Sequence, residues 1–298
     1  MEKKFKSGFV GILGRTNVGK STLVNSLVKQ KVAIISPKPQ TTRRRIRCVI
    51  NRENYQMVFV DTPGIHKPHD KLGERLNAAA LGFLEEMDVI LFMIEASGAI
   101  GKGDKFVAEK LNSIDKPKIL VLNKIDLIDE DEIEEKISET EKLGKFEEII
   151  PISAKYNKNL DILLESLSCF IPYGPPYFPE DMFTDQHPKF WVSEIIREKA
   201  LENLRKEVPH SIAVEVEKME KRKDKDIIEI EATLYVERDS QKGIVIGKNG
   251  SMLKKIGSLA RKEIELFLGE KIFMRLWVKV KKDWRKDESS INRFGYTS

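Results

Sequence analysis

The sequence has few cysteines, with only Cys48 and Cys169 among 298 residues. Two cysteines cannot build a disulfide framework, so a disulfide-stapled secreted domain is disfavoured and a reducing compartment is expected. Long hydrophobic runs are missing too, because Val89–Ile94, the longest apolar run near the middle, is far too short to span a bilayer. Met1–Lys6 lacks the apolar core of a secretory signal, so we expect neither secretion nor a membrane span.

What the sequence does contain is an uneven distribution of charge. The formal net charge is only +5. Residues 242–286 nevertheless hold 13 Lys and Arg against 4 Asp and Glu, which leaves the rest of the chain slightly acidic. A modest average therefore conceals a basic C-terminal segment, a pattern typical of a surface that binds a polyanion.

Apolar runs alternate with amphipathic stretches through residues 1–170. Each run is followed by a turn signal and then a helical pattern, which is the rhythm of βαβ units. We therefore predict an α/β domain with a mostly parallel sheet and helices on both faces. The expected strands are Phe9–Leu13, Gln56–Val60, Val89–Ile94, Lys118–Leu122 and Glu148–Ile152.

Proline and glycine interrupt this rhythm at Ile171–Pro179, where four prolines and one glycine disfavour a regular helix or a central strand. We expect a Pro-rich linker over residues 171–188 and a smaller, separate α+β domain over residues 189–298. The order expected in this second domain is α-β-β-α-α-β. Its elements are a helix over Phe190–Leu204, strands over Ile212–Met219 and Ile227–Val236, a helix–loop–helix around Gly247 and Gly250, and a strand over Lys271–Lys281.

A phosphate-binding motif, G-x-x-x-x-G-K-[ST], directly follows the first expected strand. Its glycines let backbone N–H groups surround phosphate oxygens, and the next helix directs its positive dipole end at them. Lys20 is expected to neutralise the β- and γ-phosphates, and the Ser21 hydroxyl to ligate Mg²⁺. The motif alone indicates only a nucleoside triphosphate, bound through Gly14, Arg15, Thr16, Asn17, Val18, Gly19, Lys20, Ser21 and Thr22.

Two later loops, each after an expected strand, favour guanine as the base. The Asp126 carboxylate can accept hydrogen bonds from the ring N–H and the exocyclic amine of guanine, a donor pair that adenine does not offer. Lys124 is expected to lie across the base plane, and the second loop to donate a backbone N–H to the guanine carbonyl. The predicted base-binding residues are Asn123, Lys124, Asp126, Ser153, Ala154 and Lys155.

Two further segments are expected to sense the γ-phosphate. In Asp61–Gly64, Asp61 is placed to hold Mg²⁺ through water and the Gly64 N–H to contact the γ-phosphate. In Gln40–Arg43, a threonine hydroxyl is expected to reach Mg²⁺; Thr42 is the first choice and Thr41 the alternative. Loss of the γ-phosphate would release both loops. We take Lys20, Thr42, Asp61 and Gly64 as the catalytic set.

Residues 1–170, with all five motifs in order, resemble a GTP-binding domain of the TrmE–Era–EngA–Septin-like superfamily. One departure is Ile65, which stands where many such domains place a water-orienting glutamine, so we expect slow intrinsic hydrolysis. Members of this superfamily often carry an asparagine in the phosphate loop that ligates K⁺. Asn17 occupies that place, and the resemblance implies stimulation by potassium.

In the C-terminal part, a Gly-x-x-Gly loop lies between two expected helices. The glycines would let a nucleic-acid backbone approach, and basic residues on the next helix would form a wall for phosphates. Alone, such a loop is more often a helix-capping turn, but the flanking α-β-β-α-α-β order resembles a type II KH domain, which implies single-stranded RNA binding. The predicted RNA-binding residues are Ile244 and Ile246 as an apolar floor, with Gly247, Lys248, Asn249, Gly250, Lys254 and Lys255.

Other C-terminal features are less decisive. We expect the aromatic residues Phe267, Phe273 and Trp277 to pack in the core rather than stack on bases. The basic cluster Lys279–Lys282 fits either RNA contact or solubility. Trp284 and the segment Ile291–Tyr296 would either dock against the domain or bind the RNA end.

A GTP-binding domain, a Pro-rich linker and a KH domain in this order resemble the Era family, KH-domain GTPases of ribosome assembly. Supporting residues are Asn17, Gln40–Arg43, Tyr177–Asp181, Glu194–Lys199 and Ile246–Gly250. The resemblance implies Mg²⁺ and K⁺ as cofactors. As partners it implies GTP or GDP, the 3′ end of small-subunit ribosomal RNA and the small subunit itself. We expect a monomer in the cytoplasm, with some peripheral contact at the inner membrane face.

Two rival functions use the same motifs differently. In one, the chain is a signalling or membrane-associated GTPase whose second domain binds protein or lipid. In the other, it is a metabolic P-loop kinase, which the Asn123–Asp126 loop argues against and which a preference for ATP over GTP would favour.

Overall fold

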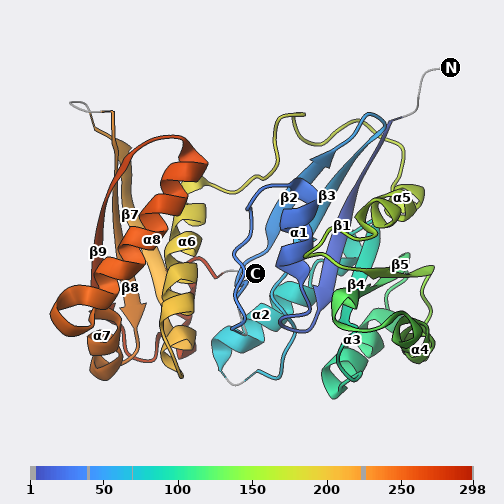
Figure 1. The fold of residues 1–298 in the computed structure, drawn as a ribbon, viewed down its shortest axis with the longest axis horizontal. Coiled ribbons are helices and arrows are strands. Elements are labelled where there is room, and N and C mark those ends of the chain that lie inside the picture. Colours follow the sequence, from blue (N-terminus) through green and yellow to red (C-terminus); the bar gives the residue numbers. More distant parts are fainter. Residues whose placement is uncertain (1–4, 39–40, 69, 223–225, 297–298) are drawn as a thin grey trace.

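The computed structural model describes residues 5–38, 41–68, 70–222 and 226–296. These residues form an α/β domain with a mostly parallel six-stranded sheet and a smaller α+β domain with a three-stranded sheet, as predicted. The two sheets lie side by side in Figure 1. Among the described residues, no helix combines the length and apolar character needed to cross a membrane. Gln40, part of one predicted switch segment, lies outside the described residues.

The first sheet has the strand order β2-β3-β1-β4-β5-β6. All neighbouring strands are parallel except β2 and β3, which pair antiparallel. The sequence pattern did not reveal β2, because it joins β3 through a short hairpin rather than through a crossover helix. The strands are β1 (Lys6–Gly14), β2 (Ile46–Asn51), β3 (Tyr55–Asp61), β4 (Val89–Glu95), β5 (Lys118–Asn123) and β6 (Glu148–Ile152).

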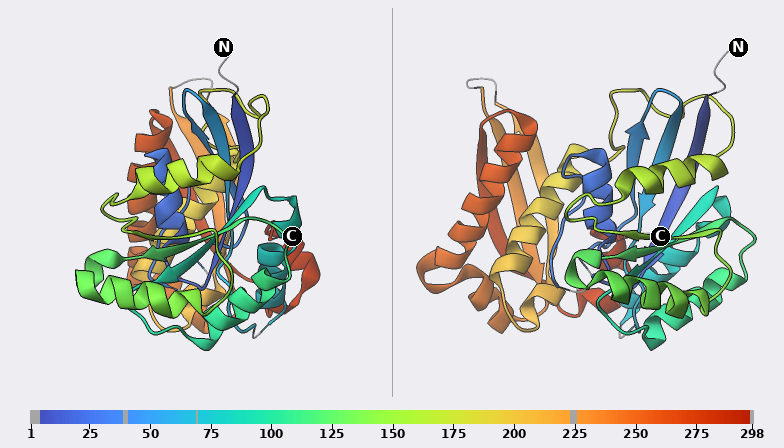
Figure 2. Two further views of the ribbon diagram at one scale, coloured as in Figure 1. Left: turned by 90° about the vertical axis from the view of Figure 1, so that its right-hand side faces the viewer. Right: turned by 45° about the vertical axis from the view of Figure 1, so that its right-hand side comes forward.

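Helices cover both faces of this sheet, as Figure 2 shows. The apolar side chains of α1 (Lys20–Val28) and α5 (Leu160–Phe170) pack on one face. Those of α2 (Lys71–Leu81), α3 (Lys102–Asn112) and α4 (Glu130–Glu141) pack on the other. Because β1 and the strands from β3 to β6 run parallel, their carboxyl ends meet at one edge of the sheet, where open α/β sheets bind ligands.

The proline-rich segment between the domains lies against the first sheet. The Val49 N–H of edge strand β2 donates to Phe183 O at 3.0 Å. The buried Gln56 side chain accepts the N–H groups of Tyr177 and Phe178 and donates to Phe178 O. Pro188 then occupies the first turn of α6, where a missing N–H has no cost.

The second domain follows the predicted order α-β-β-α-α-β, with α6 on the side of its sheet that faces the first domain (Figure 1). Strands β7 and β8 pair antiparallel, and β8 and β9 pair parallel. Its elements are α6 (Pro188–Asn203), β7 (Ala213–Lys221), β8 (Ile228–Val236), α7 (Asp239–Ile246), α8 (Ser251–Leu268) and β9 (Ile272–Val280), followed by α9 (Glu288–Arg293).

The core prediction holds for one of the three C-terminal aromatic residues. Phe267 packs against the domain core and stacks on Trp191 with ring centroids 3.8 Å apart. Phe273 and Trp277 were predicted wrongly, because they are 42% and 40% exposed. Side chains alternate along β9, so that Ile272 and Val278 are buried while positions 273 and 277 share the opposite face.

After β9 the chain returns to the first domain. The Trp284 side chain is fully buried and contacts Phe294 edge-on, with ring centroids 5.3 Å apart. Both belong to an apolar cluster with Leu72 and Leu76 of α2. Of the two alternatives for this segment, the structure therefore favours docking, and the docking surface spans both domains.

Candidate nucleotide and RNA sites

The phosphate loop lies between β1 and α1 in a conformation that only a few residue types adopt. Gly19 has a φ of 105°, and a Cβ there would lie 2.2 Å from the amide nitrogen of Asn123. Asn17 also has a positive φ, which asparagine tolerates better than most residues. The sequence thus places glycine where the loop turns sharply toward the end of β5.

Lys20 is buried at the base of this loop. Its Nζ donates to Gly14 O at 3.1 Å and to Arg15 O at 2.8 Å. Burial lowers the pKa of Lys20 to about 8, although the nearby Asp61 carboxylate acts in the opposite direction. A buried ammonium group that the phosphate loop holds by its own carbonyl oxygens suits the recognition of phosphate.

Three predicted magnesium ligands lie together beside Lys20. The Ser21 hydroxyl donates to Asp61 Oδ2 at 2.8 Å and lies 2.9 Å from Thr42 Oγ1. Thr41 points elsewhere, because its hydroxyl donates to Lys38 O at 2.6 Å. The structure therefore brings Thr42, and not Thr41, to the other two residues.

The donor set at this point fits a hard divalent cation. Asp61 Oδ1 is buried and has no hydrogen-bond partner among the described residues. Burial raises the pKa of Asp61 to about 6, while the charge of Lys20 lowers it. A buried carboxylate oxygen that lacks a donor, next to two hydroxyl oxygens, has the chemistry that Mg²⁺ requires.

The segment after β3 contacts the phosphate loop directly. The Ile65 N–H donates to Gly14 O at 3.1 Å, so Gly64 lies against the loop. The Ile65 side chain is only 3% exposed and packs in the apolar cluster between the sheet and α2 and α3. The Ile65 side chain therefore points into the core and does not line the nucleotide pocket.

The predicted base-binding loops meet through side-chain hydrogen bonds. Buried Asn123 donates to Val18 O at 2.8 Å and accepts the Ala154 N–H at 3.0 Å, which ties three loops together. Ser153 Oγ donates to Asp126 Oδ1 at 2.5 Å. Lys124 pairs with Glu95 at 2.8 Å, a partner that the motif search missed, while Lys155 is exposed.

The phosphate loop, Thr41, Thr42, Gly64 and Lys124 line a pocket of about 390 Å³. The other predicted base-binding residues, Asn123, Asp126 and Ser153–Lys155, are not part of this lining. One of its walls, the segment Ile34–Pro37, was not predicted, because no motif marks it and only the fold brings it to the phosphate loop. Arg15 stays outside the lining and pairs with Asp104 of α3 at 2.7 Å. The lining residues are Thr16, Asn17, Gly19, Lys20, Ser21, Thr22, Ile34, Ile35, Ser36, Pro37, Thr41, Thr42, Gly64 and Lys124.

The Gly-x-x-Gly loop lies between α7 and α8, as predicted, with Lys248 and Asn249 exposed at its tip. Beside it is a groove of about 500 Å³ lined by Gly250, Lys254 and Arg261. Its apolar lining comes from Leu253 of α8 and from Ile272, Phe273, Met274 and Leu276 of β9. Ile244 and Ile246, the predicted floor, belong to α7 and do not line this groove.

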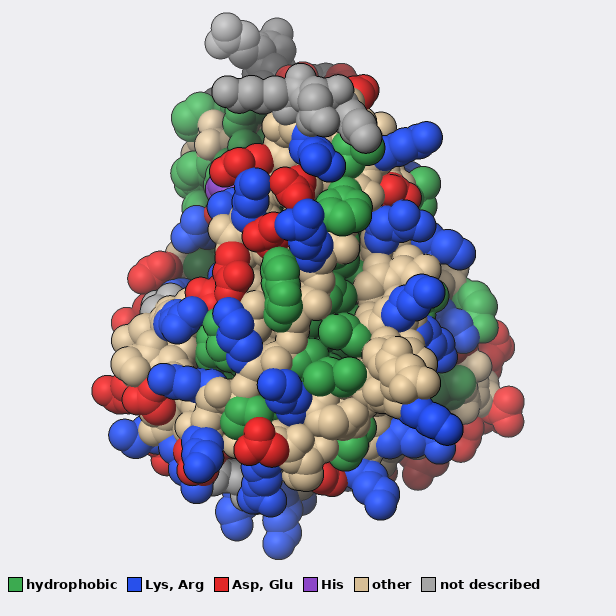
Figure 3. Space-filling view, turned by 90° about the vertical axis from the view of Figure 1, so that its left-hand side faces the viewer, with side chains coloured by type: hydrophobic (Ala, Val, Ile, Leu, Met, Phe, Trp, Pro, Cys, Tyr) green, Lys and Arg blue, Asp and Glu red, His purple; other side chains and the backbone are tan. Residues whose placement is uncertain are grey.

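The surface around the groove is basic. Lys254 and Lys255 are exposed on the first turns of α8, and Lys279 and Lys281 are exposed at the end of β9. Figure 3, which looks at the outer side of the C-terminal domain, shows Lys and Arg side chains spread among hydrophobic ones, with Asp and Glu side chains between them. Such a mixture suits a strand with charged phosphates and apolar base faces.

Comparison with known proteins gives consistent matches over the whole chain. Residues 9–124 match the family described as 50S ribosome-binding GTPase, and residues 207–285 match the KH domain family. A GTPase Era from Clostridioides difficile (strain 630) is 52% identical over 293 residues, which cover 98% of this chain and 99% of the relative. A GTPase Era from Caldanaerobacter subterraneus subsp. tengcongensis is 49% identical, with 98% of both chains covered.

Two solved structures are also similar over nearly the whole chain. One is Era in complex with MgGDPNP and nucleotides 1506–1542 of 16S ribosomal RNA, at 43% identity and a TM-score of 0.96. The other is a substituted Era from Aquifex aeolicus bound to GDP and AlF4⁻, at 42% identity and the same TM-score. Each comparison covers 99% of this chain and 100% of the other.

Proposed function

This chain belongs to the Era family of GTPases, and from that membership we propose that it is a GTP-hydrolysing switch that binds the single-stranded 3′ end of small-subunit ribosomal RNA. In this role it assists assembly of the small ribosomal subunit. The observation that carries the proposal is one chain that joins two sites: a pocket with a cation-binding oxygen set and a basic groove beside a Gly-x-x-Gly loop.

In the pocket, Ser21, Thr42 and Asp61 would hold Mg²⁺, with the unpartnered Asp61 oxygen as the strongest structural support. The metal would neutralise charge on the β- and γ-phosphates. Lys20 would add its positive charge to the same phosphates, and the Gly64 N–H would contact the γ-phosphate. Asn123, Lys124, Asp126 and the loop Ser153–Lys155 would bind guanine.

Hydrolysis without a partner is expected to be slow. The Ile65 side chain is apolar and buried, so it cannot orient an attacking water. Even a domain that carries a glutamine at this position turns over at only about 10⁻⁴ s⁻¹ on its own. An RNA or ribosomal partner would then supply or order the missing group, which makes the GTP-bound state long-lived until its target is reached.

A bound potassium ion at Asn17 is the finer part of the cofactor proposal. Asn17 is exposed at the pocket, and its amide nitrogen donates to Pro37 O at 2.8 Å. The amide oxygen is the atom that K⁺ would use. We expect faster hydrolysis in K⁺ than in Na⁺ buffer, and an Asn17→Ala variant that loses this difference. Equal rates in both buffers would contradict the potassium proposal alone.

We propose that residues 1–170 form the domain that binds GTP and that residues 189–298 form the domain that binds RNA. Residues 171–188 are the linker between them. Contact with RNA would use Gly247–Gly250 together with Lys254, Lys255 and the apolar groove of α8 and β9. Action in the cytoplasm as a monomer, with peripheral contact at the inner membrane face, stays a prediction.

Crosslinking tests this function directly. The full-length protein, loaded with GDPNP and Mg²⁺, is crosslinked to total RNA, and the attached fragments are sequenced. We expect enrichment of the 3′ end of small-subunit ribosomal RNA over the same preparation with GDP. Fragments spread evenly over cellular RNA, or recovery of no ribosomal 3′ end, would contradict the proposal.

A further inference from the structure

One wall of the nucleotide pocket is held at both ends by consecutive residues of the other domain. The described part of this wall is residues 35–38 and 41–42, and the residues that hold it are Arg197 and Glu198 of α6. At one end, Glu198 Oε1 accepts the Ile35 N–H at 2.8 Å. At the other, Arg197 Nη2 donates to Thr41 O. Because Thr41 directly precedes Thr42, the Arg197 contact bears on the hydroxyl that lies beside Ser21, while the Glu198 contact holds Ile35 in the pocket wall.

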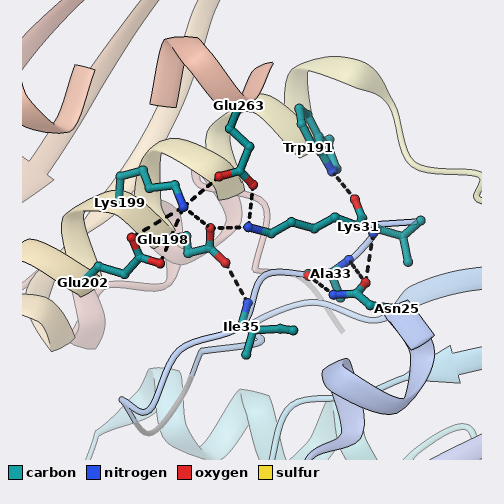
Figure 4. Close-up of polar contacts among 10 residues, drawn as sticks. Asn25, Lys31, Ala33, Ile35, Trp191, Glu198, Lys199, Glu202 and Glu263 are labelled. Atoms are coloured by element: carbon teal, nitrogen blue, oxygen red, sulfur yellow. Dashed lines mark hydrogen bonds and ion pairs between the residues drawn. The ribbon is translucent and has the colours of Figure 1, made fainter. Parts of the chain in front are cut away.

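Glu198 is fixed by more than this one hydrogen bond. Its side chain is 1% exposed, and Oε2 pairs with Lys31 Nζ at 2.5 Å and with Lys199 Nζ at 2.8 Å (Figure 4). Burial alone would lower the pKa of Lys199, but hydrogen bonds to Glu198 and Glu263 raise that pKa above its ordinary value. Lys199 therefore stays charged at neutral pH, and its contact and that of Lys31 leave the Glu198 side chain little freedom to turn away from Ile35.

Arg197 is fixed in a similar way. It is completely buried, and its Nε donates to Glu194 Oε1 at 2.8 Å. Its Nη2 is shared between Glu194 Oε2 and Thr41 O. Such a forked arrangement holds the guanidinium in one orientation. Trp191 Nε1 donates to Lys31 O at 2.9 Å, which adds another contact from α6 to the connection between α1 and β2, just before the pocket wall.

We propose that Arg197 and Glu198 are positioning residues for the nucleotide site, which hold residues 35–38 and 41–42 so that Thr42 is in place before Mg²⁺ and the γ-phosphate arrive. This inference rests on the proposed function of the pocket. A GTPase loop of this kind is ordered by the γ-phosphate and its Mg²⁺. When another domain already orders the loop, less binding free energy is lost to that ordering, so GTP binds more tightly. GDP, which lacks the γ-phosphate, gains no such advantage.

The experiment measures the preference of the full-length protein for GDPNP over GDP, both with Mg²⁺, by titration calorimetry. In Glu198→Ala, we expect the Kd of GDPNP to rise about tenfold, the effect of losing a hydrogen bond to a charged group, while the Kd of GDP changes by less than about twofold. Glu198→Gln keeps an oxygen that can accept the Ile35 N–H, and it should restore most of the preference. Arg197→Lys, which lacks the fork, should lose preference as Glu198→Ala does.

Glu202→Gln is the matched control, because Glu202 lies on the same helix and pairs with Lys199 at 3.4 Å, with no polar contact to the described residues 35–38 and 41–42. It should keep the wild-type preference. Thermal melting identifies the folded variants, and Arg197→Lys carries the test if Glu198→Ala does not fold. An unchanged preference, or an equal loss of both nucleotides in folded variants, would overturn the inference. Failure of the wild type to bind either nucleotide would instead overturn the proposed function.

Discussion

At the scale of single residues, Asp61 shows how a binding site stores unfavourable free energy. Its buried carboxylate has one oxygen with no hydrogen-bond partner in the described part of the chain, and burial raises its pKa from 3.8 to about 6. The folded protein therefore binds this proton more tightly than the unfolded chain does. The resulting stability is complete below pH 3.8 and is lost as the pH rises through 6. Without a cation, the ionised carboxylate destabilises the fold at neutral pH.

This reasoning predicts that Asp61→Asn stabilises the protein when metal and nucleotide are absent. In urea unfolding with EDTA, the variant should exceed the wild type by about 3 kcal/mol at pH 7.5 and by about half of that at pH 5.0. With Mg²⁺ and GDPNP the order should reverse, because only the wild type keeps the full ligand set. A variant that is less stable at both pH values in EDTA would contradict the explanation.

We propose that Asp126 selects the base, with one carboxylate that accepts two hydrogen bonds from guanine. In Asp126→Asn, we expect the affinity for GDP to fall about a hundredfold, because one acceptor becomes a donor that faces the guanine amine. Xanthine carries an oxygen in place of that amine, so the affinity for XDP should rise in the same variant. Competition between the two nucleotides and a fluorescent GDP measures both changes. A variant that loses both nucleotides equally would argue against Asp126 as the base-reading group.

The role of a residue could be predicted where it is set by neighbours in the sequence, and not where it is set by contacts with distant segments. Lys20, Ser21 and Asn123 lie in short motifs whose spacing determines their chemistry, and the structure brings them together. The geometry also separates Thr42 from Thr41, which spacing alone left open. Glu198 could not be predicted, because its contact with Ile35 joins residues of two domains.

At the scale of elements, the Gly-x-x-Gly loop contains two glycines with different structural demands. Both have a positive φ, but a Cβ on Gly247 would lie 2.9 Å from Met252 N, whereas a Cβ on Gly250 would meet nothing within 4 Å. Substitution of Gly247 would therefore disturb the start of α8. Gly250 leaves room for a charged side chain at the groove, and the strain that its positive φ imposes falls on any substitution there alike.

Gly250→Asp should weaken RNA binding about tenfold or more, because its carboxylate repels phosphates at the groove. Gly250→Asn is the matched control, since asparagine and aspartate tolerate the left-handed conformation about equally and only one is charged. The control should stay within about threefold of the wild type. Filter binding with single-stranded RNA measures both, and GDP affinity should be unchanged. Equal RNA affinities for the two variants would mean that phosphates do not approach this loop.

In the first sheet, strands that are joined to their neighbours through crossover helices could be predicted from the alternation of apolar and amphipathic segments. A strand of that sheet that is joined only by a hairpin could not. The strand β1 and the β8–β9 pair follow apolar runs visible in the sequence. The edge strand β2 pairs antiparallel and carries the Pro-rich segment on its open side, so no rhythm marks it. Strand β9 was predicted, but its exposed Phe273 and Trp277 were not, because aromatic residues alone do not indicate which face of a strand is covered.

At the scale of the whole molecule, the two sites are connected by charged side chains at the domain interface. Helix α8 begins just after the Gly-x-x-Gly loop and carries Glu263, which pairs with Lys199 at 2.7 Å and also with Lys31. Lys31 pairs in turn with Glu198. A shift of α8 when RNA fills the groove would thus act on the same carboxylate that holds the nucleotide pocket.

Linkage makes this connection measurable in both directions. If GDPNP tightens RNA binding by some factor relative to GDP, RNA must increase the preference for GDPNP over GDP by the same factor, commonly about 5 to 150. In Glu263→Gln, we expect that factor to fall toward one while the affinities for GDP alone and for RNA with GDP stay near wild type. Glu202→Gln should keep the full factor, because its carboxylate lies at the margin of the same cluster. A wild-type factor of one would show that the domains bind independently, and an unchanged factor in Glu263→Gln would place the coupling elsewhere in the interface, for example where Trp284 packs against α2.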